Sequence, residues 1–256
     1  MVALIASIIG AISGLGGGVI IKPVLDLLGE HPITTINILS AFTVLSMSIV
    51  SIGRHIIYKT KIEYKIGIFL AAGAFLGGYI GNFLFSRLLK TVAHANSVIF
   101  VQNAILVLLL ICVLIYTNKF REKATFRLKN PLIIIVTGIC LGTASSFLGI
   151  GGGPINIVAL SLLFAMEPKQ AAVNSILLIF FSQASKLITT ALSGGFVGQD
   201  LTMLWLMIPA GILGGFIGST LNKKLKVAQM TTVFNATTVV IIAVGIINSL
   251  KCLFPL

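Results

Sequence analysis

The chain has 256 residues, of which 57% are hydrophobic and only 9% charged, and its mean hydropathy is +1.10. Because soluble domains carry about 25% charged residues, this composition excludes an ordinary soluble protein and predicts an integral membrane protein. The formal charge of +12 would suggest nucleic-acid binding in a soluble chain. Here the basic residues lie in short intervals between apolar stretches, so we interpret them as setting orientation in the membrane and expect no nucleic-acid partner.

Apolar stretches long enough to cross a hydrocarbon core of about 30 Å recur along the chain. Two of the apolar runs, 2–29 and 131–166, are interrupted by glycines. The uninterrupted predicted spans cover residues 34–52, 66–85, 97–117, 171–192, 202–221 and 230–250. We therefore expect an all-α, multi-pass membrane protein with six ordinary spans and two broken elements.

Each broken run contains the same kind of pentapeptide, Gly-Leu-Gly-Gly-Gly at 14–18 and Gly-Ile-Gly-Gly-Gly at 149–153. Four glycines in five positions cannot hold a helix, because each costs about 1 kcal/mol relative to alanine. Inside a membrane, irregular backbone is tolerated only where it is buried in protein or lines a cavity. Each pentapeptide therefore predicts a helix break whose N–H groups can face a polar ligand.

The sequence also resembles itself at a separation of about 135 to 137 residues. Three features align in the same order: the two pentapeptides, Pro32 to Asn37 with Pro168 to Asn174 after one insertion, and Leu-Gly-Gly-x-x-Gly at 76–81 with the same pattern at 213–218. We interpret the chain as one membrane domain made by duplication. Its first repeat covers 1–117, its basic cytoplasmic linker 118–130 and its second repeat 131–256.

The direction of the repeats depends on whether each broken element crosses the membrane once or turns back. If each turns back, the intervals 53–65, 118–130, 165–170 and 222–228 share one side and hold thirteen basic residues, against three on the other side. The positive-inside rule favours this version. Residues 2–14 would cover about 20 Å of helix, half a bilayer, whereas 131–148 could nearly span. We expect two inverted repeats, each a glycine-broken re-entrant hairpin plus three transmembrane helices.

In such an arrangement, the half-helices that follow the breaks would present their N-termini to an anion. The backbone candidates for substrate binding are Gly16, Gly17, Gly18, Gly151, Gly152 and Gly153. The alternative is that these glycines only allow close helix packing. We favour packing for the Gly-Gly-x-x-Gly patterns at 77–81 and 214–218, which lie inside otherwise regular spans.

Two lysines lie inside apolar segments, where charged residues are rare and are functional candidates by default. Lys22 follows the first break, and Lys186 lies in the predicted span 171–192. Either could hold an anion. The alternatives are an ion pair of Lys22 with Asp26, one turn further on, and snorkelling of Lys186 to the interface. Asp26 is also our candidate for proton coupling, because it alone among the acidic residues lies clearly within an apolar element.

Amides and hydroxyls can donate to an anion without the desolvation cost of a charge. The candidates are Asn37, Asn174, Ser182, Gln183 and Ser185. Interhelical hydrogen bonding is the alternative for all of them. The histidines and cysteines are dispersed, and no nucleophile, base and acid fall into an enzyme-like pattern. We therefore expect no metal, no cofactor and no catalytic residues.

The doubled Gly-x-Gly-Gly-Gly motif, Pro23 after its first copy, the turns that lead to Asn37 and Asn174, and Ser-Gln-x-Ser-Lys at 182–186 resemble the TauE/SafE family of sulfite exporters. The resemblance covers essentially the whole chain. It implies a multi-pass permease of the cytoplasmic membrane that moves sulfite, thiosulfate, a sulfonate or a related organic anion. The family's positions carry over to Gly14, Gly16, Gly17, Gly18, Gly149, Gly151, Gly152 and Gly153, and further to Asn174, Gln183 and Lys186.

Lys22 and Asn156 depart from the commoner apolar residues of that family, which leaves the particular anion open. We expect alternating access between the two repeats. Two other functions fit the sequence, an anion channel, which needs no coupling residue, and a structural subunit of a membrane complex. The expected partners are a small anion and membrane lipid, and assembly into a homo-oligomer is left open.

Overall fold

The computed structural model describes residues 1–58, 64–92, 95–120 and 126–253, and every regular element in these ranges is a helix. The helices are α1 (Val2–Ser13), α2 (Gly18–Leu28), α3 (Ile33–Ile57), α4 (Tyr64–Thr91), α5 (Ala95–Ile115) with a π-helical turn η1 (Tyr116–Phe120), α6 (Pro131–Leu148), α7 (Gly153–Phe164), α8 (Pro168–Leu192), α9 (Leu204–Lys224) and α10 (Val227–Leu253). Residues 121–125 of the expected linker 118–130 lie outside the described ranges.

Within the described ranges, seven helices are long and apolar enough to cross a membrane, namely α3, α4, α5, α6, α8, α9 and α10. The all-helical, multi-pass prediction is confirmed. Six of the seven are the uninterrupted predicted spans. The seventh is α6, the first arm of the second broken element, whose 18 residues extend for about 27 Å.

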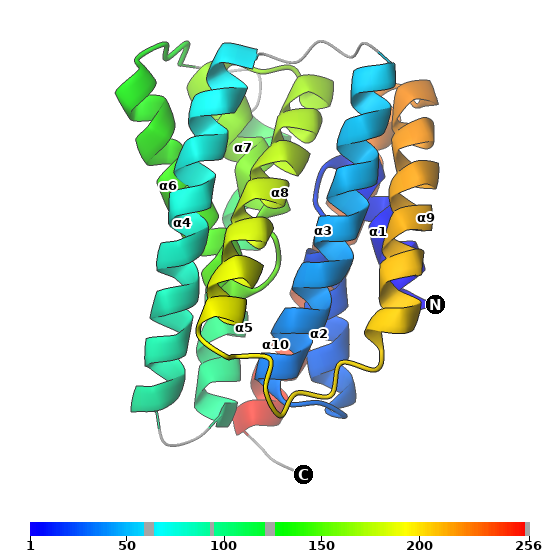
Figure 1. Ribbon diagram of the computed structural model, residues 1–256. Helices are drawn as coiled ribbons and strands as arrows, with labels where there is room; N and C mark the ends of the chain where they lie inside the picture. Colours follow the sequence, from blue (N-terminus) through cyan, green and yellow to red (C-terminus); the bar gives the residue numbers. More distant parts are fainter. Residues whose placement is uncertain (59–63, 93–94, 121–125, 254–256) are drawn as a thin grey trace.

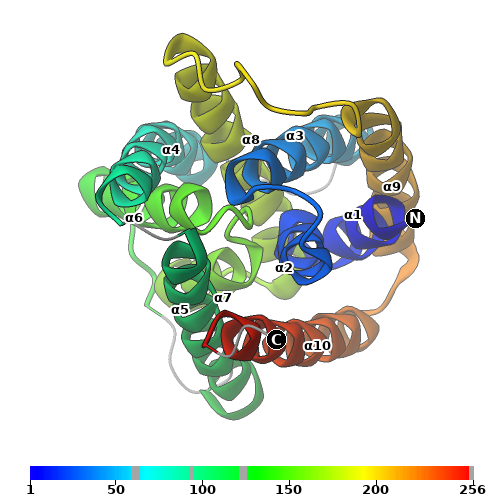
Figure 2. The same ribbon diagram turned by 90° about the horizontal axis from the view of Figure 1, so that it is seen from below.

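The helices run roughly along one direction, with their ends gathered at two opposite faces (Figure 1). The C-terminal ends of α3, α7 and α9 lie at the upper end in this view, whereas those of α2, α4 and α8 lie at the lower end. Figure 2 shows the short helices α2 and α7 toward the middle of the bundle, α2 beside α3 and α10 and α7 beside α8 and α5. The two helix breaks therefore lie in the interior.

Glycines bring two pairs of helices into backbone contact. In α4, Gly73, Gly77 and Gly81 lie so close to the backbone of α6 that a Cβ would not fit. In α9, Gly214 and Gly218 lie against α1 in the same way. Small residues commonly permit such close approach between membrane helices, and the packing interpretation of these two motifs is confirmed.

Two hydrogen bonds between the two halves correspond to each other. The corresponding residues are separated along the sequence by the same interval as Gly14 and Gly149. Ser40 Oγ donates a hydrogen bond to the carbonyl oxygen of Gly149 at 3.4 Å. Ser175 Oγ donates correspondingly to the carbonyl oxygen of Gly14 at 2.7 Å. These two hydrogen bonds occupy corresponding positions, as the predicted duplication requires.

This separation corrects one detail of the sequence alignment. Asn37 lies against Gly149, but the residue that lies against Gly14 is Ala172. Asn37 and Asn174 are therefore not equivalent positions, and the inserted residue is not needed. The matching prolines misled the alignment, because one precedes α3 as its N-cap and the other is the first residue of α8.

Candidate functional site

Both predicted helix breaks are present, and positive backbone φ angles form them. α1 ends at Gly14 (φ 76°), and the chain bends again at Gly16 (φ 75°) before α2 begins. α6 ends at Gly149 (φ 69°) in the same left-handed conformation. Residues with side chains rarely adopt this left-handed backbone conformation. The glycines therefore allow the chain to reverse direction at each of the two breaks.

The two breaks touch one another. Gly18, the first residue of α2, lies against the carbonyl of Ile150 in the opposite break. Gly153, the first residue of α7, lies against the carbonyl of Leu15. Leu15 and Ile150 are both 0% exposed, so the N-terminal turns of α2 and α7 meet in a dry interior.

The first amides of these two helices have no hydrogen-bond acceptor among the described residues. A helix leaves its first N–H groups without an intrahelical acceptor. Within the described part of the chain, no side chain or loop carbonyl accepts from the N–H groups of Gly18, Val19, Gly153 or Ile155. Four donors at two positive helix ends are thus grouped at the contact between the breaks.

Lys22 pairs with Asp26 one turn further along α2. Its Nζ lies 2.9 Å from Asp26 Oδ2, and the two side chains are 2% and 0% exposed. The ion-pair interpretation of Lys22 is therefore confirmed. The stem of Lys22 also lies beside Gly149, next to the amide of Asn37, so the pair borders the tip of the opposite hairpin.

Lys186 is buried in α8 and does not snorkel. It is 2% exposed, and its Nζ has no hydrogen-bond partner among the described residues. Lys186 and Asn37 line one cavity of about 100 Å³, together with Asn82, Ser86, Thr34 and Thr190. Both polar atoms of the Asn37 amide also lack a partner in the described ranges. Lys186 and Asn37 therefore contribute to the wall of one small cavity of mixed polar and apolar lining, while Lys186 Nζ and the polar atoms of the Asn37 amide are themselves buried.

Ser182 and Gln183 belong to a second polar cluster beside the second break. Ser145 Oγ of α6 lies 3.2 Å from Ser182 Oγ and accepts a hydrogen bond of 3.2 Å from Gln183 Nε2. Ser145 and Asn156 also flank Gly152, where a Cβ would be 2.9 Å from Ser145 Cβ. This cluster holds the second break against α8.

Asn174 and Ser185 lie elsewhere. Asn174 Nδ2 donates to the carbonyl oxygen of Gln170 at 2.9 Å, and its Oδ1 faces Gly67 of α4. Ser185 packs against Gly78 of the same helix. These two side chains therefore contribute to the α4–α8 interface rather than to the contact between the breaks.

Sequence reasoning missed several polar residues of the two clusters, namely Thr34, Asn82, Ser145 and Thr190. Asn82 follows the second glycine motif and is an isolated amide in an apolar span, a signal that could have identified it. Ser145 gives no such signal, because serines in membrane helices often bond only to their own backbone. Only its position opposite Ser182 in the structure distinguishes Ser145 from serines that bond to their own helix.

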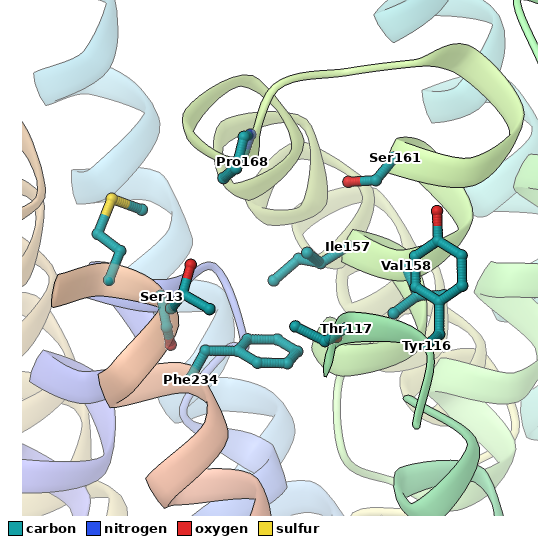
Figure 3. Close-up of a pocket in the computed structure, with 10 residues that line it drawn as sticks. Ser13, Tyr116, Thr117, Ile157, Val158, Ser161, Pro168 and Phe234 are labelled. Carbon is teal, nitrogen blue, oxygen red and sulfur yellow. The ribbon is translucent and has the colours of Figure 1, made fainter. Parts of the chain in front are cut away.

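Two further cavities lie near the ends of the bundle. One of about 310 Å³ is lined by residues that include Asp26, His31, Asn248 and Lys251. The other, of about 40 Å³, is shown in Figure 3, where Phe234, Ile157 and Ser161 surround it with Tyr116 and Ser13.

Among the residues that the structure describes, no three His, Cys, Asp or Glu side chains are grouped as metal ligands would be.

A multi-pass helical bundle in which two broken helices meet beside buried charges is the architecture of a membrane transporter. The chain belongs to the sulfite exporter TauE/SafE family, whose model matches residues 1–246.

Its curated relatives carry names of the same class. The probable membrane transporter protein YunE of Bacillus subtilis is 27% identical over 275 aligned positions, which cover 96% of this chain and 94% of the relative. The probable membrane transporter protein MJ0441 of Methanocaldococcus jannaschii is 27% identical and covers 88% of this chain and 86% of its own length. No solved structure shows a significant match.

Proposed function

We propose that this protein is a permease for a small sulfur-containing or organic anion, such as sulfite, thiosulfate or a sulfonate, in the cytoplasmic membrane. The observation that carries this proposal is the buried Lys186 ammonium without a partner in the described ranges, in a cavity shared with Asn37. A charge in a membrane interior is costly. An anion in this cavity removes that cost, since it supplies the missing counter-charge.

The surrounding groups suit an oxyanion rather than a cation. The cavity adds amide donors from Asn37 and Asn82, whereas the hydroxyls of Thr34 and Thr190 already donate to Gln199 and to the carbonyl oxygen of Lys186. The free N–H groups at the start of α2 and α7 provide positive helix ends nearby. Sulfite, thiosulfate and sulfonates present several acceptor oxygens, so such a set of donors can bind them from more than one direction.

Alternating access between two inverted repeats is the transport mechanism that we propose. α3 and α8 run in opposite directions in Figure 1, and the contact of Ser40 with Gly149 corresponds to that of Ser175 with Gly14. Two halves of opposite direction that meet at one site can rock about it to open either end. Asp26 is the carboxylate that we assign to proton coupling.

The upper end of Figure 1 is the cytoplasmic side in this proposal. Arg54, Lys169 and Lys224 belong to helix ends there, whereas Arg87 and Lys90 belong to the C-terminal end of α4 at the lower end. The excess of basic residues at the upper end supports this orientation.

The test is uptake by purified protein in proteoliposomes, with sulfite, thiosulfate and methanesulfonate as substrates. We expect uptake of at least one anion by the wild type and a loss of about tenfold or more in Lys186→Met, since one charge-assisted hydrogen bond is removed. Lys90→Met, an exposed lysine of α4, is the matched control and should leave uptake unchanged.

Three results would contradict the proposal. Equal uptake by Lys186→Met and wild type would remove Lys186 from the site. Single-channel conductance in a planar bilayer would indicate a channel instead of a carrier. Absence of uptake for the whole anion panel, together with a stable protein partner on purification, would indicate a structural subunit.

A further inference from the structure

The cavities at the two ends of the bundle are counterparts in the duplicated chain. Asp26, Ile33, Ile99, Lys251 and Cys252 of the larger cavity correspond, at the separation of Gly14 from Gly149, to Ser161, Pro168, Phe234, Tyr116 and Thr117 of the smaller one. The two cavities, of about 310 and 40 Å³, therefore share part of their lining positions, one cavity at each end. Figure 3 shows the smaller one, which holds hydroxyl and aromatic groups.

The two cavities differ in charge. Asp26 corresponds to Ser161, and its ion-pair partner Lys22 corresponds to Ile157. Lys251 corresponds to Tyr116. The corresponding place in the second half holds a neutral pair, so the buried ion pair is a feature of the first half alone. It points to a function at that end alone.

Asp26 is placed to receive a proton from this cavity. Its Oδ2 holds Lys22 Nζ at 2.9 Å, while its Oδ1 has no hydrogen-bond partner within the described part of the chain. The cavity that Asp26 lines has exposed residues at its rim, Gly29 and Lys251. The side chain of Asp26 is itself 0% exposed, so in the coupling step proposed below the proton passes from this cavity to a carboxylate buried behind its wall.

Lys22 connects this carboxylate to the proposed anion site. The aliphatic part of the Lys22 side chain and the Asn37 amide both lie beside Gly149. Asn37 also lines the cavity that Lys186 lines. When Asp26 is ionised, it neutralises Lys22 in the empty protein. We propose that protonation of Asp26 releases Lys22 to the transported anion, so that a proton and an anion bind together. This inference rests on the proposed function, because it assigns the coupling step of the same site.

The charged and titratable groups around Asp26 favour this coupling. Lys251 and Cys252 of α10 and His31 of the connection before α3 line the same cavity as Asp26, and Lys22 lies on its own helix. Lys186 of α8 is a further buried basic group. Among these basic groups, Lys22 is the one that pairs directly with Asp26. A bound anion cancels part of their charge, so proton and anion increase each other's affinity.

The sign follows from this linkage. At high pH an anion must compete with ionised Asp26 for Lys22, whereas at low pH Lys22 is free. Thiosulfate and methanesulfonate are anions of strong acids, so their own charges do not change in this titration. Their affinity should therefore rise as pH falls. The limit for one linked proton is about tenfold per pH unit.

The experiment measures anion affinity as a function of pH by isothermal titration, and proton uptake on anion addition in weakly buffered solution, with the purified full chain. The test variant is Asp26→Asn, which imitates the protonated carboxyl. We expect it to bind the anion with little pH dependence and to take up no proton. Glu30→Gln, which removes an exposed carboxylate at the same end, should behave as the wild type does.

A second variant keeps the test decisive if Asp26→Asn does not fold. Lys22→Ile with Asp26→Ser copies Ile157 and Ser161, a pair that this fold already accepts. It should lose proton uptake and retain weaker binding through Lys186. Proton uptake that persists in either folded variant overturns the inference and leaves the permease proposal intact. If no anion of the panel binds to the wild type, the permease proposal fails, and the coupling step falls with it.

Discussion

Gly153, the first residue of α7, lies directly against the carbonyl of Leu15 in the opposite helix break. The two hairpins therefore meet backbone to backbone, and a side chain at this position would push them apart. Since Gly153 does not have a positive φ angle, the restriction comes from the neighbouring hairpin.

Gly153→Ala should accordingly destabilise the protein by about 1 to 3 kcal/mol, the usual cost of overpacking, and lower the unfolding temperature in detergent. Gly53→Ala in α3 is the matched control, because no heavy atom lies within 4 Å of its Cβ position. That change should be neutral or should stabilise by about 0.5 to 1 kcal/mol. Equal unfolding temperatures for the two variants would contradict the contact between the hairpins.

Two serines anchor the hairpin tips unequally. Ser175 Oγ donates to Gly14 at 2.7 Å, and Ser40 Oγ donates to Gly149 at 3.4 Å. Removal of the shorter bond leaves a buried carbonyl without its donor, at a cost of about 1 to 3 kcal/mol. Ser175→Ala should therefore lower the unfolding temperature more than Ser40→Ala, with exposed Ser193→Ala as the reference. The reverse order would be evidence against this difference between the tips.

Amides from other helices complete the last turns of α1 and α6. Asn222 Nδ2 donates to the carbonyl oxygen of Ile12 at 2.5 Å, and Gln102 Nε2 donates to that of Phe147 at 2.5 Å. The final carbonyls of a helix have no partner within it. Asn222→Leu and Gln102→Leu should each reduce the unfolding temperature in detergent. A leucine that is tolerated at both sites would show that water satisfies these carbonyls instead.

The sidedness of the chain can be tested with single cysteines. The background variant carries alanine in place of Cys112, Cys140 and Cys252. Cysteines that replace Glu30 and Val197, at the lower end, should react with an impermeant thiol reagent in intact cells. Those that replace Lys169 and Lys224, at the upper end, should react only after permeabilisation. Labelling of Glu30 and Lys169 positions from the same side would exclude the proposed inverted repeats.

The lysines show how far local sequence determines the site. The spacing of four residues made an ion pair between Lys22 and Asp26 foreseeable, because residues i and i+4 are neighbours on one helix face. Spacing along the helix could not decide whether Lys186 is buried or snorkels to the interface. Its burial depends on α3 and α4, which cover it from distant parts of the chain, and no spacing within α8 reports on them.

The amides show the same limit. Asn37 and Asn174 looked equivalent in an alignment with one insertion, yet one lies at a hairpin tip and the other at the α4–α8 interface. A shift of one residue turns a helix face by about 100°, so a small alignment error moves a side chain to another neighbour. Only the contacts between the halves, which pair Asn37 with Gly149 and Ala172 with Gly14, assign each amide to its place.

The sequence by itself determined that the chain is a helical membrane protein with two glycine breaks, because hydropathy and backbone freedom are local properties of the residues. The tertiary structure alone decided that the breaks touch, that Lys186 lies unpaired among the described residues beside Asn37, and that one end cavity is charged while its counterpart is neutral. These features join residues far apart in the chain, and packing brings them together without leaving a periodic pattern in the sequence.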